Sequence, residues 1–222
     1  MNTTAIIVAA GTGSRFKSEI PKQFLDLAGK PILVHTIERV ASAPSVDTVI
    51  AVVPSEYVTE LGGISIPKPL RVVTGGATRA ASVFNGLNAV EDDCEIVAIH
   101  DGARPLVSVD EIERTIAKAK EMGAACLVAP VTDTIKSIRG NEIAATLDRD
   151  KLRRALTPQA FRTDVLRRAF EAVELNESVT DDCYLVEKLG HPIALVEGSV
   201  RNIKITNADD LQLAEMIYRN DA

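Results

Sequence analysis

The segment that most constrains the fold lies at the start of the chain, where an apolar run ends in a glycine-rich loop. Residues Ala5–Ala10 are all small or branched apolar residues, and Gly11 and Gly13 follow them. A continuous apolar run of this length is typical of a strand buried on both faces in a parallel sheet. A glycine loop after such a strand lets backbone amides approach a phosphate group. The sequence therefore predicts an anion site at the end of the first strand.

The residues after the loop narrow the kind of anion site. A dinucleotide fingerprint needs a third glycine where this chain has Phe16, and the P-loop pattern is missing from the segment. What remains is a G-x-G-x-R pattern with Arg15, followed by Pro21, Lys22 and Gln23. Two cations beside a glycine loop indicate a highly charged ligand such as a nucleoside triphosphate. The alternative is a tight turn whose glycines serve only the backbone conformation.

Composition limits the other function classes. The chain has 222 residues, is 46% apolar and carries a net charge of −6, so it can bury one core and does not attract a polyanion such as DNA. We expect one domain over residues 1–222. Cys94, Cys126 and Cys183 lack metal-ligand spacing, which favours buried free thiols. No basic leader precedes the first apolar run, and the run is too short to span a membrane, so we expect a soluble cytoplasmic protein.

Apolar runs and helical patterns alternate along the rest of the chain, which predicts a three-layer α/β/α sandwich with a mostly parallel sheet. A helix is expected over Pro31–Ala41, a second begins at a capping box of Ser108 and Glu111, and a third covers Asp209–Tyr218. The expected strands are residues 5–10, 48–53, 71–73, 96–100, 124–129, 193–196 and 203–205.

One segment interrupts this alternation. Residues 132–138 and 142–147 flank a turn at 139–141 and predict a β-hairpin. An isolated hairpin cannot bury two faces. We therefore expect residues 132–150 to form a protruding arm that packs on a second subunit, giving a homodimer.

Short motifs along nearly the whole chain together resemble the 2-C-methyl-D-erythritol 4-phosphate cytidylyltransferase family of the non-mevalonate isoprenoid pathway. Single motifs are weak, and their ordered occurrence carries the resemblance. It implies a Rossmann-like sheet of the nucleotidyltransferase type and transfer of CMP from CTP to a polyol phosphate. The motifs are residues 9–15, 21–24, 75–82, 100–105, 129–136, 148–149, 156–159, 180–182 and 202–206.

The resemblance implies a cationic catalytic set. Arg15 and Lys22 would stabilise the crowded transition state and the departing pyrophosphate, and Lys204 would face the α-phosphate. Mg²⁺ would be bound mainly through the CTP phosphates, with no metal ligands assigned to the protein. The alternative for Lys22 and Lys204 is the ordinary exposed surface lysine.

The resemblance also implies a nucleotide site built largely from backbone groups. Glycines suit such a site because the chain can approach the base closely. Ala77 stands where the family often has an acidic residue, and Arg79 is either part of this region or one member of a structural ion pair. The implied nucleotide-binding residues are Ala9, Ala10, Gly11, Gly13, Gly75, Gly76, Ser82, Asp101 and Gly102.

The acceptor site implied by the resemblance lies at the carboxyl end of the most apolar strand. Asp101 would orient ribose or acceptor hydroxyls or lie near Mg²⁺, and Arg104 would approach the acceptor. Thr134 and Arg149 of a neighbouring subunit's arm would hold the acceptor phosphate, together with Thr157; the alternative for Arg149 is a solvated charge cluster. His100 alternates with Asp101 along the strand, so we expect it to be packed rather than catalytic.

Two other functions remain open. A ribitol 5-phosphate cytidylyltransferase shares the glycine loop and the P-K-Q motif, although Ala103 before Arg104 and Leu156 before Thr157 favour the methylerythritol family. A catalytically silent nucleotide-binding module on the same fold is the other. The retention of all three cationic positions argues against it.

Overall fold

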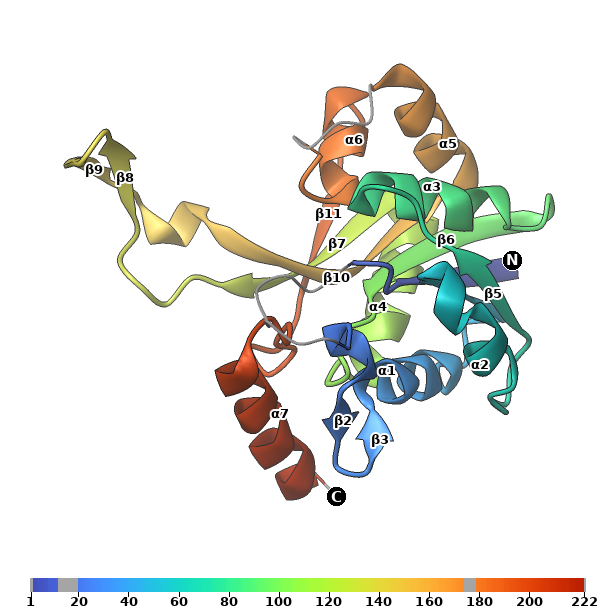
Figure 1. Ribbon diagram of the computed structural model, residues 1–222. Coiled ribbons are helices and arrows are strands. Elements are labelled where there is room, and N and C mark those ends of the chain that lie inside the picture. The colour runs from blue at the N-terminus through green and yellow to red at the C-terminus, as the bar shows by residue number, and fades with distance from the viewer. Residues whose placement is uncertain (1, 12–19, 174–178, 222) are drawn as a thin grey trace.

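The computed structural model describes residues 2–11, 20–173 and 179–221, and a seven-stranded sheet forms its centre (Figure 1). The strand order is β11-β7-β10-β6-β1-β4-β5, and among these strands β10 alone runs antiparallel to its neighbours. This confirms the expected mostly parallel sheet. The strands are β1 (Asn2–Val8), β4 (Thr48–Val53), β5 (Leu70–Thr74), β6 (Cys94–Asp101), β7 (Ala124–Pro130), β10 (Arg153–Arg162) and β11 (Ala194–Glu197).

Helices cover both faces of this sheet, so the expected three-layer sandwich is confirmed (Figure 1). Alternation along β1 shows the two cores: Ile7 belongs to the core that contains residues of α1 and α4, and Ile6 to the core that contains residues of α3, α5 and α6. The helices are α1 (Ile32–Ala41), α2 (Val58–Gly62), α3 (Arg79–Asn88), α4 (Val109–Met122), α5 (Thr163–Ala172), α6 (Asp182–Lys188) and α7 (Ala208–Asp221). Short 3₁₀ helices cover Lys22–Phe24, Ser55–Tyr57 and Arg149–Lys151.

The predicted helix ends are confirmed where local chemistry defines them. Pro31 precedes α1, and the Ser108–Glu111 capping box opens α4, with both reciprocal hydrogen bonds present. Gly123 ends α4 with a φ of 87°, the left-handed conformation that glycine adopts without strain. The predicted last helix is confirmed as α7. The three cysteines are free and buried, as expected.

Six predicted strands are confirmed, and the one at residues 203–205 is wrong. That segment runs alongside the end of β6 without joining the sheet, and the Ile205 amide donates a hydrogen bond of 2.9 Å to the carbonyl of Ala103. The Ile205 side chain is buried with Leu27 and Ile32 in a small separate core. The apolar residues of this segment thus serve a local core rather than a strand of the sheet. No strand was expected at β10, which the structure places between β6 and β7.

The arm is confirmed as a β-hairpin that projects from the body at the left of Figure 1. It contains β8 (Lys136–Arg139) and β9 (Glu142–Thr146), while a smaller hairpin, β2 (Asp26–Leu27) and β3 (Lys30–Pro31), precedes α1. Ile138 and Ile143 of the arm are 73% and 67% exposed. In the described part of the chain, no helix is both long and apolar enough to cross a membrane.

The carboxyl edge of the sheet is held together by close approach between loops. A Cβ atom placed on Gly75, after β5, would lie 2.1 Å from the Cβ of Ala10, after β1. A Cβ on Gly102, after β6, would lie 2.8 Å from the Cβ of Ala9. Neither contact involves a flexible side chain that could move aside. Neither glycine has a positive φ, so backbone conformation does not require them. The close packing of the loops is what leaves no room for a side chain at these positions.

We expect Gly75→Ala to lower the free energy of unfolding by about 1–3 kcal/mol, the usual cost of overpacking a tight site. Gly62→Ala is the matched control, because no atom lies within 4 Å of a Cβ built there. That change should be neutral or stabilise by about 0.4–1 kcal/mol through the unfolded chain. Urea unfolding of both variants measures the difference. Equal stabilities would show that the loops separate without cost.

Candidate functional site

A cavity of about 530 Å³ opens at the carboxyl edge of the sheet. It lies between the end of β1, the loop before α3, the end of β6 and the segment before α7. Its walls include the predicted residues Ala9, Ala10, Gly11, Lys22, Gly76, Ser82, Asp101 and Lys204, together with Gln23, Thr78, Arg79 and Thr206. A ligand at this edge is the general expectation for open α/β sheets.

A second cavity of about 270 Å³ adjoins the first. The two share Arg79, Asp101 and Lys204, so these three side chains form the boundary between them. The second cavity is also lined by Arg104, Ala155, Leu156, Thr157, Gln159, Thr180 and Asp181. Two small adjoining cavities with a charged boundary can hold two substrates whose reactive groups meet there.

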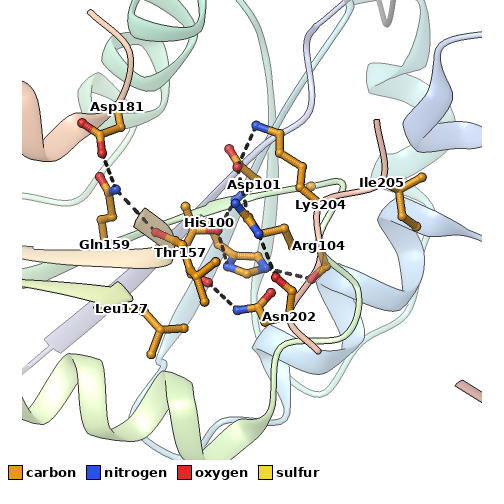
Figure 2. Close-up of polar contacts among 12 residues, drawn as sticks. His100, Asp101, Arg104, Leu127, Thr157, Gln159, Asp181, Asn202, Lys204 and Ile205 are labelled. Atoms are coloured by element: carbon orange, nitrogen blue, oxygen red, sulfur yellow. Dashed lines mark hydrogen bonds and ion pairs between the residues drawn. The ribbon is translucent and has the colours of Figure 1, made fainter. Parts of the chain in front are cut away.

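Three cations surround the Asp101 carboxylate at this boundary. Lys204 Nζ lies 2.8 Å from Oδ2, Arg79 Nε lies 3.4 Å from Oδ1, and Arg104 Nε lies 3.4 Å from Oδ2. Burial alone would raise the pKa of Asp101, but Arg79, Lys204 and Arg104 together hold it well below its ordinary value. Asp101 is therefore ionised, and it gathers three positive charges in one place. Figure 2 shows Lys204 and Arg104 converging on it.

Arg79 belongs to two ion pairs. Its Nη2 lies 2.7 Å from Oδ2 of Asp182 on α6, and its Nε faces Asp101. Burial would lower the pKa of Arg79, but Asp182 and Asp101 outweigh it and raise the pKa above its ordinary value. The ion-pair alternative is thus correct for Arg79, although the same side chain also lines both cavities.

Lys22 and Lys204 come together although 182 positions of sequence separate them. The Lys22 ammonium donates a 2.7 Å hydrogen bond to the carbonyl of Ile205, the residue after Lys204. The 3₁₀ helix at Lys22–Phe24 therefore anchors the segment that carries Lys204. The Lys204 side chain is 35% exposed, so it retains access to the cavity.

Gln23 shapes the glycine loop. Its side-chain amide donates to the carbonyls of Ala9 and Gly11, and Gln23 is 2% exposed. The P-K-Q motif in the sequence does not by itself indicate what the glutamine does. Its buried amide holds the exit of β1 in place.

Ser82 acts on the neighbouring loop from the first turns of α3. Its hydroxyl accepts a 3.0 Å hydrogen bond from the Gly76 amide and donates to the carbonyl of Thr78 at 2.9 Å. The hydroxyl thus fixes the loop that faces the cavity. A direct contact with a base stays a prediction.

A neutral hydrogen-bond chain lies under the charged cluster (Figure 2). His100 Nε2 faces the carbonyl of Arg104 at 3.0 Å, so this nitrogen carries the proton. Nδ1 then accepts from the Thr157 hydroxyl at 3.0 Å, and that oxygen accepts from the Asp101 amide at 3.1 Å. His100 is buried and acts as a packed residue, as expected from the strand alternation.

Asn202 connects the same chain to the Lys204 segment. Its side-chain amide donates to the Thr157 carbonyl at 2.9 Å, and its own carbonyl accepts from Arg104 Nη1 at 2.8 Å. The Asn202 side chain is buried. Hydrogen bonds therefore join strand β6, strand β10 at Thr157 and the segment before α7 directly behind the boundary of the cavities.

Comparison with known proteins decides the family. The family model described as "IspD: 2-C-methyl-D-erythritol 4-phosphate cytidylyltransferase" matches residues 3–220. The chain belongs to this family. A protein of that name from Desulforamulus reducens is 43% identical over 225 residues, which cover 98% of this chain and 96% of the relative. A bifunctional IspD/IspF enzyme from Desulfotalea psychrophila is 42% identical, and the chain spans 57% of its length.

Solved structures agree with this result. The 2-C-methyl-D-erythritol 4-phosphate cytidylyltransferase from Thermus thermophilus superposes with a TM-score of 0.78 at 35% identity, covering 99% of this chain and 100% of that one. The Francisella tularensis enzyme of the same name superposes with a TM-score of 0.83 at 34% identity, covering 97% of this chain and 99% of that one. The whole fold, including the region of the two cavities, is therefore that of the IspD family.

The remaining predicted site residues are dispersed. Gly75 and Gly102 lie behind the cavity wall at the close approaches described above. Thr134 and Arg149 lie on the exposed arm and line neither cavity of their own chain; Arg149 donates to the carbonyl of Thr132 at 2.7 Å. Gly13 and Arg15 fall outside the described residues. Asp181 lines the smaller cavity and Asp182 pairs with Arg79, although the sequence indicated only their motif.

We expect the buried His100 to make stability depend on pH. Burial lowers its pKa to about 4 from an ordinary value near 6.5. The unfolded chain therefore binds a proton that the native state refuses, and stability falls as the pH drops from about 6.5 to 4, by at most roughly 3 kcal/mol for this group. Urea unfolding at several pH values across this range should show a shallower fall for His100→Asn than for the wild type.

His191→Asn serves as the control for that measurement, since His191 lies outside the site and its exposed ring contacts the carbonyl of the neighbouring Pro192. Its pH profile should match the wild type. A His100→Asn profile as steep as that of the wild type would assign the acid sensitivity to other groups.

Proposed function

We propose that this chain transfers CMP from CTP to 2-C-methyl-D-erythritol 4-phosphate, giving 4-diphosphocytidyl-2-C-methyl-D-erythritol and pyrophosphate. Membership in a family of nucleotidyltransferases with this name supports the reaction class. The observation that carries the proposal is the boundary of Arg79, Asp101 and Lys204 shared by two adjoining cavities. Two anionic substrates that enter the two cavities would meet beside these cations.

The larger cavity suits the nucleotide. Its wall consists largely of small residues and backbone at Ala9–Gly11 and Gly76–Thr78, which allow a planar base to approach closely. Ala77 lines this cavity without a polar side chain, so recognition of the base would rest on backbone groups and Ser82. Lys22 lies where it would meet the triphosphate, and Arg15 is proposed to join it.

The smaller cavity suits the acceptor, whose phosphate would enter beside Arg104 and Lys204. One oxygen of that phosphate forms the new bond to the α-phosphorus of CTP, and the bond from this phosphorus to the bridging oxygen of the β-phosphate breaks. The attacking phosphate is already ionised, so no general base is required. The task is to neutralise and align two polyanions, which fixed cations do well.

Mg²⁺ is proposed to arrive with the triphosphate. Asp101 is the one carboxylate among the described residues that line the larger cavity, and three cations already surround it. In the described part of the chain, no cluster of three or more His, Cys, Asp or Glu side chains could hold a metal. This donor set fits an ion coordinated mainly by phosphate oxygens. Bound there, Mg²⁺ would offset charge on the departing pyrophosphate.

The arm is proposed to pair two chains in the cytoplasm. Residues 132–150 project from the body with Ile138, Ile143 and Leu147 exposed. Such apolar side chains on an isolated hairpin need a covering surface. A second copy would cover them and would bring Thr134 and Arg149 to the acceptor cavity of its neighbour, where Arg149 and Thr157 would contact the phosphate.

Pyrophosphate release with CTP and Mg²⁺ tests the reaction, with methylerythritol phosphate and ribitol 5-phosphate supplied in turn. We expect turnover with the first acceptor. Lys204→Met should lower kcat by about 10²–10³, the range for a lost preorganised charge. Lys118→Met on α4 is the control, because this half-buried lysine loses only a pair with Glu121, and it should keep wild-type rates. Turnover restricted to ribitol 5-phosphate would reassign the acceptor, and no turnover with either would favour a silent module.

Arg149→Ala should raise the acceptor KM by about tenfold or more, because a phosphate contact of 1.5–3 kcal/mol is lost, while the KM for CTP stays unchanged. Steady-state kinetics with each substrate varied in turn measure both values. A collapse of CTP affinity would contradict the assignment of the arm.

Mixing two impaired variants, assayed with the acceptor well below its KM so that Arg149→Ala is also slow, separates a shared site from a local one. If the arm serves the neighbouring subunit, an equal mixture of Arg149→Ala and Lys204→Met that exchanges subunits should regain about a quarter of wild-type activity, since one site in each mixed dimer is intact. Sedimentation should show a dimer. No recovery in a mixture that has exchanged subunits would show that each chain uses its own arm.

A further inference from the structure

Asp182 is a buried carboxylate next to the boundary of the cavities that the proposed reaction leaves without a role. It is the first residue of α6, and its side chain is 1% exposed. Oδ2 lies 2.7 Å from Arg79 Nη2, whereas Oδ1 is buried and has no hydrogen-bond partner among the described residues. An incompletely satisfied buried carboxylate is costly, and burial raises the pKa of Asp182 against the opposing effect of Arg79.

The fold holds this carboxylate rigidly. Gln159 of β10 accepts hydrogen bonds from the amides of Asp182 and Cys183 at 3.1 and 3.0 Å, and its side-chain amide donates to Asp181 Oδ2 at 2.8 Å (Figure 2 shows the last contact). Asp181 in turn caps the helix by accepting from the Tyr184 amide. The sheet therefore fixes the first turn of α6, and with it the position of the Asp182 carboxylate.

The consequence for Arg79 is a defined orientation. Arg79 extends into the site from the first turn of α3. Packing alone would not fix the orientation of so long a side chain. Asp182 pairs with Nη2 of Arg79, so Nε faces Oδ1 of Asp101 and Oδ2 of Asp101 remains nearest Lys204. Without Asp182, Asp101 would be the carboxylate left to Arg79 among these ion pairs. The guanidinium would then compete with Lys204 and Arg104 for it.

We propose that Asp182 is the positioning residue of Arg79, holding its guanidinium at the boundary between the two cavities so that Lys204 keeps its place beside Asp101. Asp182 itself lines neither cavity among the described contacts and acts through Arg79. This inference rests on the proposed function, because the alignment it preserves is that of two substrates meeting at the boundary. A misplacement of about 1 Å at such a point costs about 10²-fold in rate.

The test uses the full-length protein, with active-site concentration normalised by CTP-binding stoichiometry. Asp182→Asn keeps the shape and removes the charge, and we expect kcat to fall about 10–100-fold with less than about threefold change in either KM. Asp182→Glu, which keeps a carboxylate, should recover part of the loss. Asp164→Asn is the matched control, since Asp164 is a first-turn helix carboxylate that pairs with the exposed Arg168; its kcat should stay at the wild-type value.

A double-mutant cycle separates positioning from a general structural effect. In an Arg79→Met background, Asp182→Asn should have no further effect on kcat, because the residue through which it acts is gone. The double variant removes both charges of the pair, so we expect it to fold where a single variant is destabilised by an unpaired buried charge. Unchanged kcat in Asp182→Asn, or an equal fold-loss in both backgrounds, would overturn the proposal.

A structural readout keeps this inference distinct from the proposed function. The Nη2–H resonance of Arg79, the group that donates to Asp182 at 2.7 Å, should be sharp and protected from exchange in ¹⁵N spectra of the wild type and should lose that protection in Asp182→Asn. Persistence of the protected signal would overturn the positioning role whether or not the enzyme turns over. A wild type without turnover, with the resonance behaving as expected, would instead contradict the proposed function and the kinetic consequence while leaving the positioning itself supported.

Discussion

The site depends on the ion pairs that the buried carboxylate of Asp101 makes with three cations. Taking a carboxylate out of water is unfavourable, and here the cost is met by three cations that come from α3, from the loop after β6 and from the segment before α7. The attraction works in both directions, because Arg79, Arg104 and Lys204 would repel one another without the charge between them. One buried carboxylate thus gathers cations from distant parts of a chain whose net charge is −6, and Asp182 holds one of them, Arg79, from its other side.

Neutral hydrogen bonds determine where that charge sits. Asp101 is the last residue of β6, and its amide donates to the Thr157 hydroxyl, which in turn donates a hydrogen bond to Nδ1 of His100. A protonated His100 would place a fourth positive charge there and leave the hydroxyl without its acceptor. Burial prevents this by keeping the pKa of His100 near 4. The charged layer is therefore supported by a layer whose protonation state is fixed at neutral pH.

The sequence predicted the parts of the fold that depend on local pattern and missed those that depend on partners. Buried strands such as Thr48–Val53 and the caps of α4 were predicted correctly because continuous apolar runs, capping residues and glycine preference act within a few residues. β10 was missed because Pro158 interrupts its apolar residues and arginines occupy its ends, a pattern that normally argues against a central strand. Residues 203–205 resembled a strand, but their burial comes from a local core. Asp182 could not have been found, because its partner Arg79 is 103 positions away.

The protonation states of these groups limit the mechanism to positioning and charge. Asp101 holds no proton to give and, with a pKa well below its ordinary value, does not take one at neutral pH. His100 has both ring nitrogens engaged in hydrogen bonds within the protein. A reaction that required proton transfer would be poorly served by this site, whereas attack by an ionised phosphate needs none. The site is therefore matched to a nucleophile that arrives already charged, and Asp101 holds the cations at the point where, in the proposed reaction, two phosphates would compete for them.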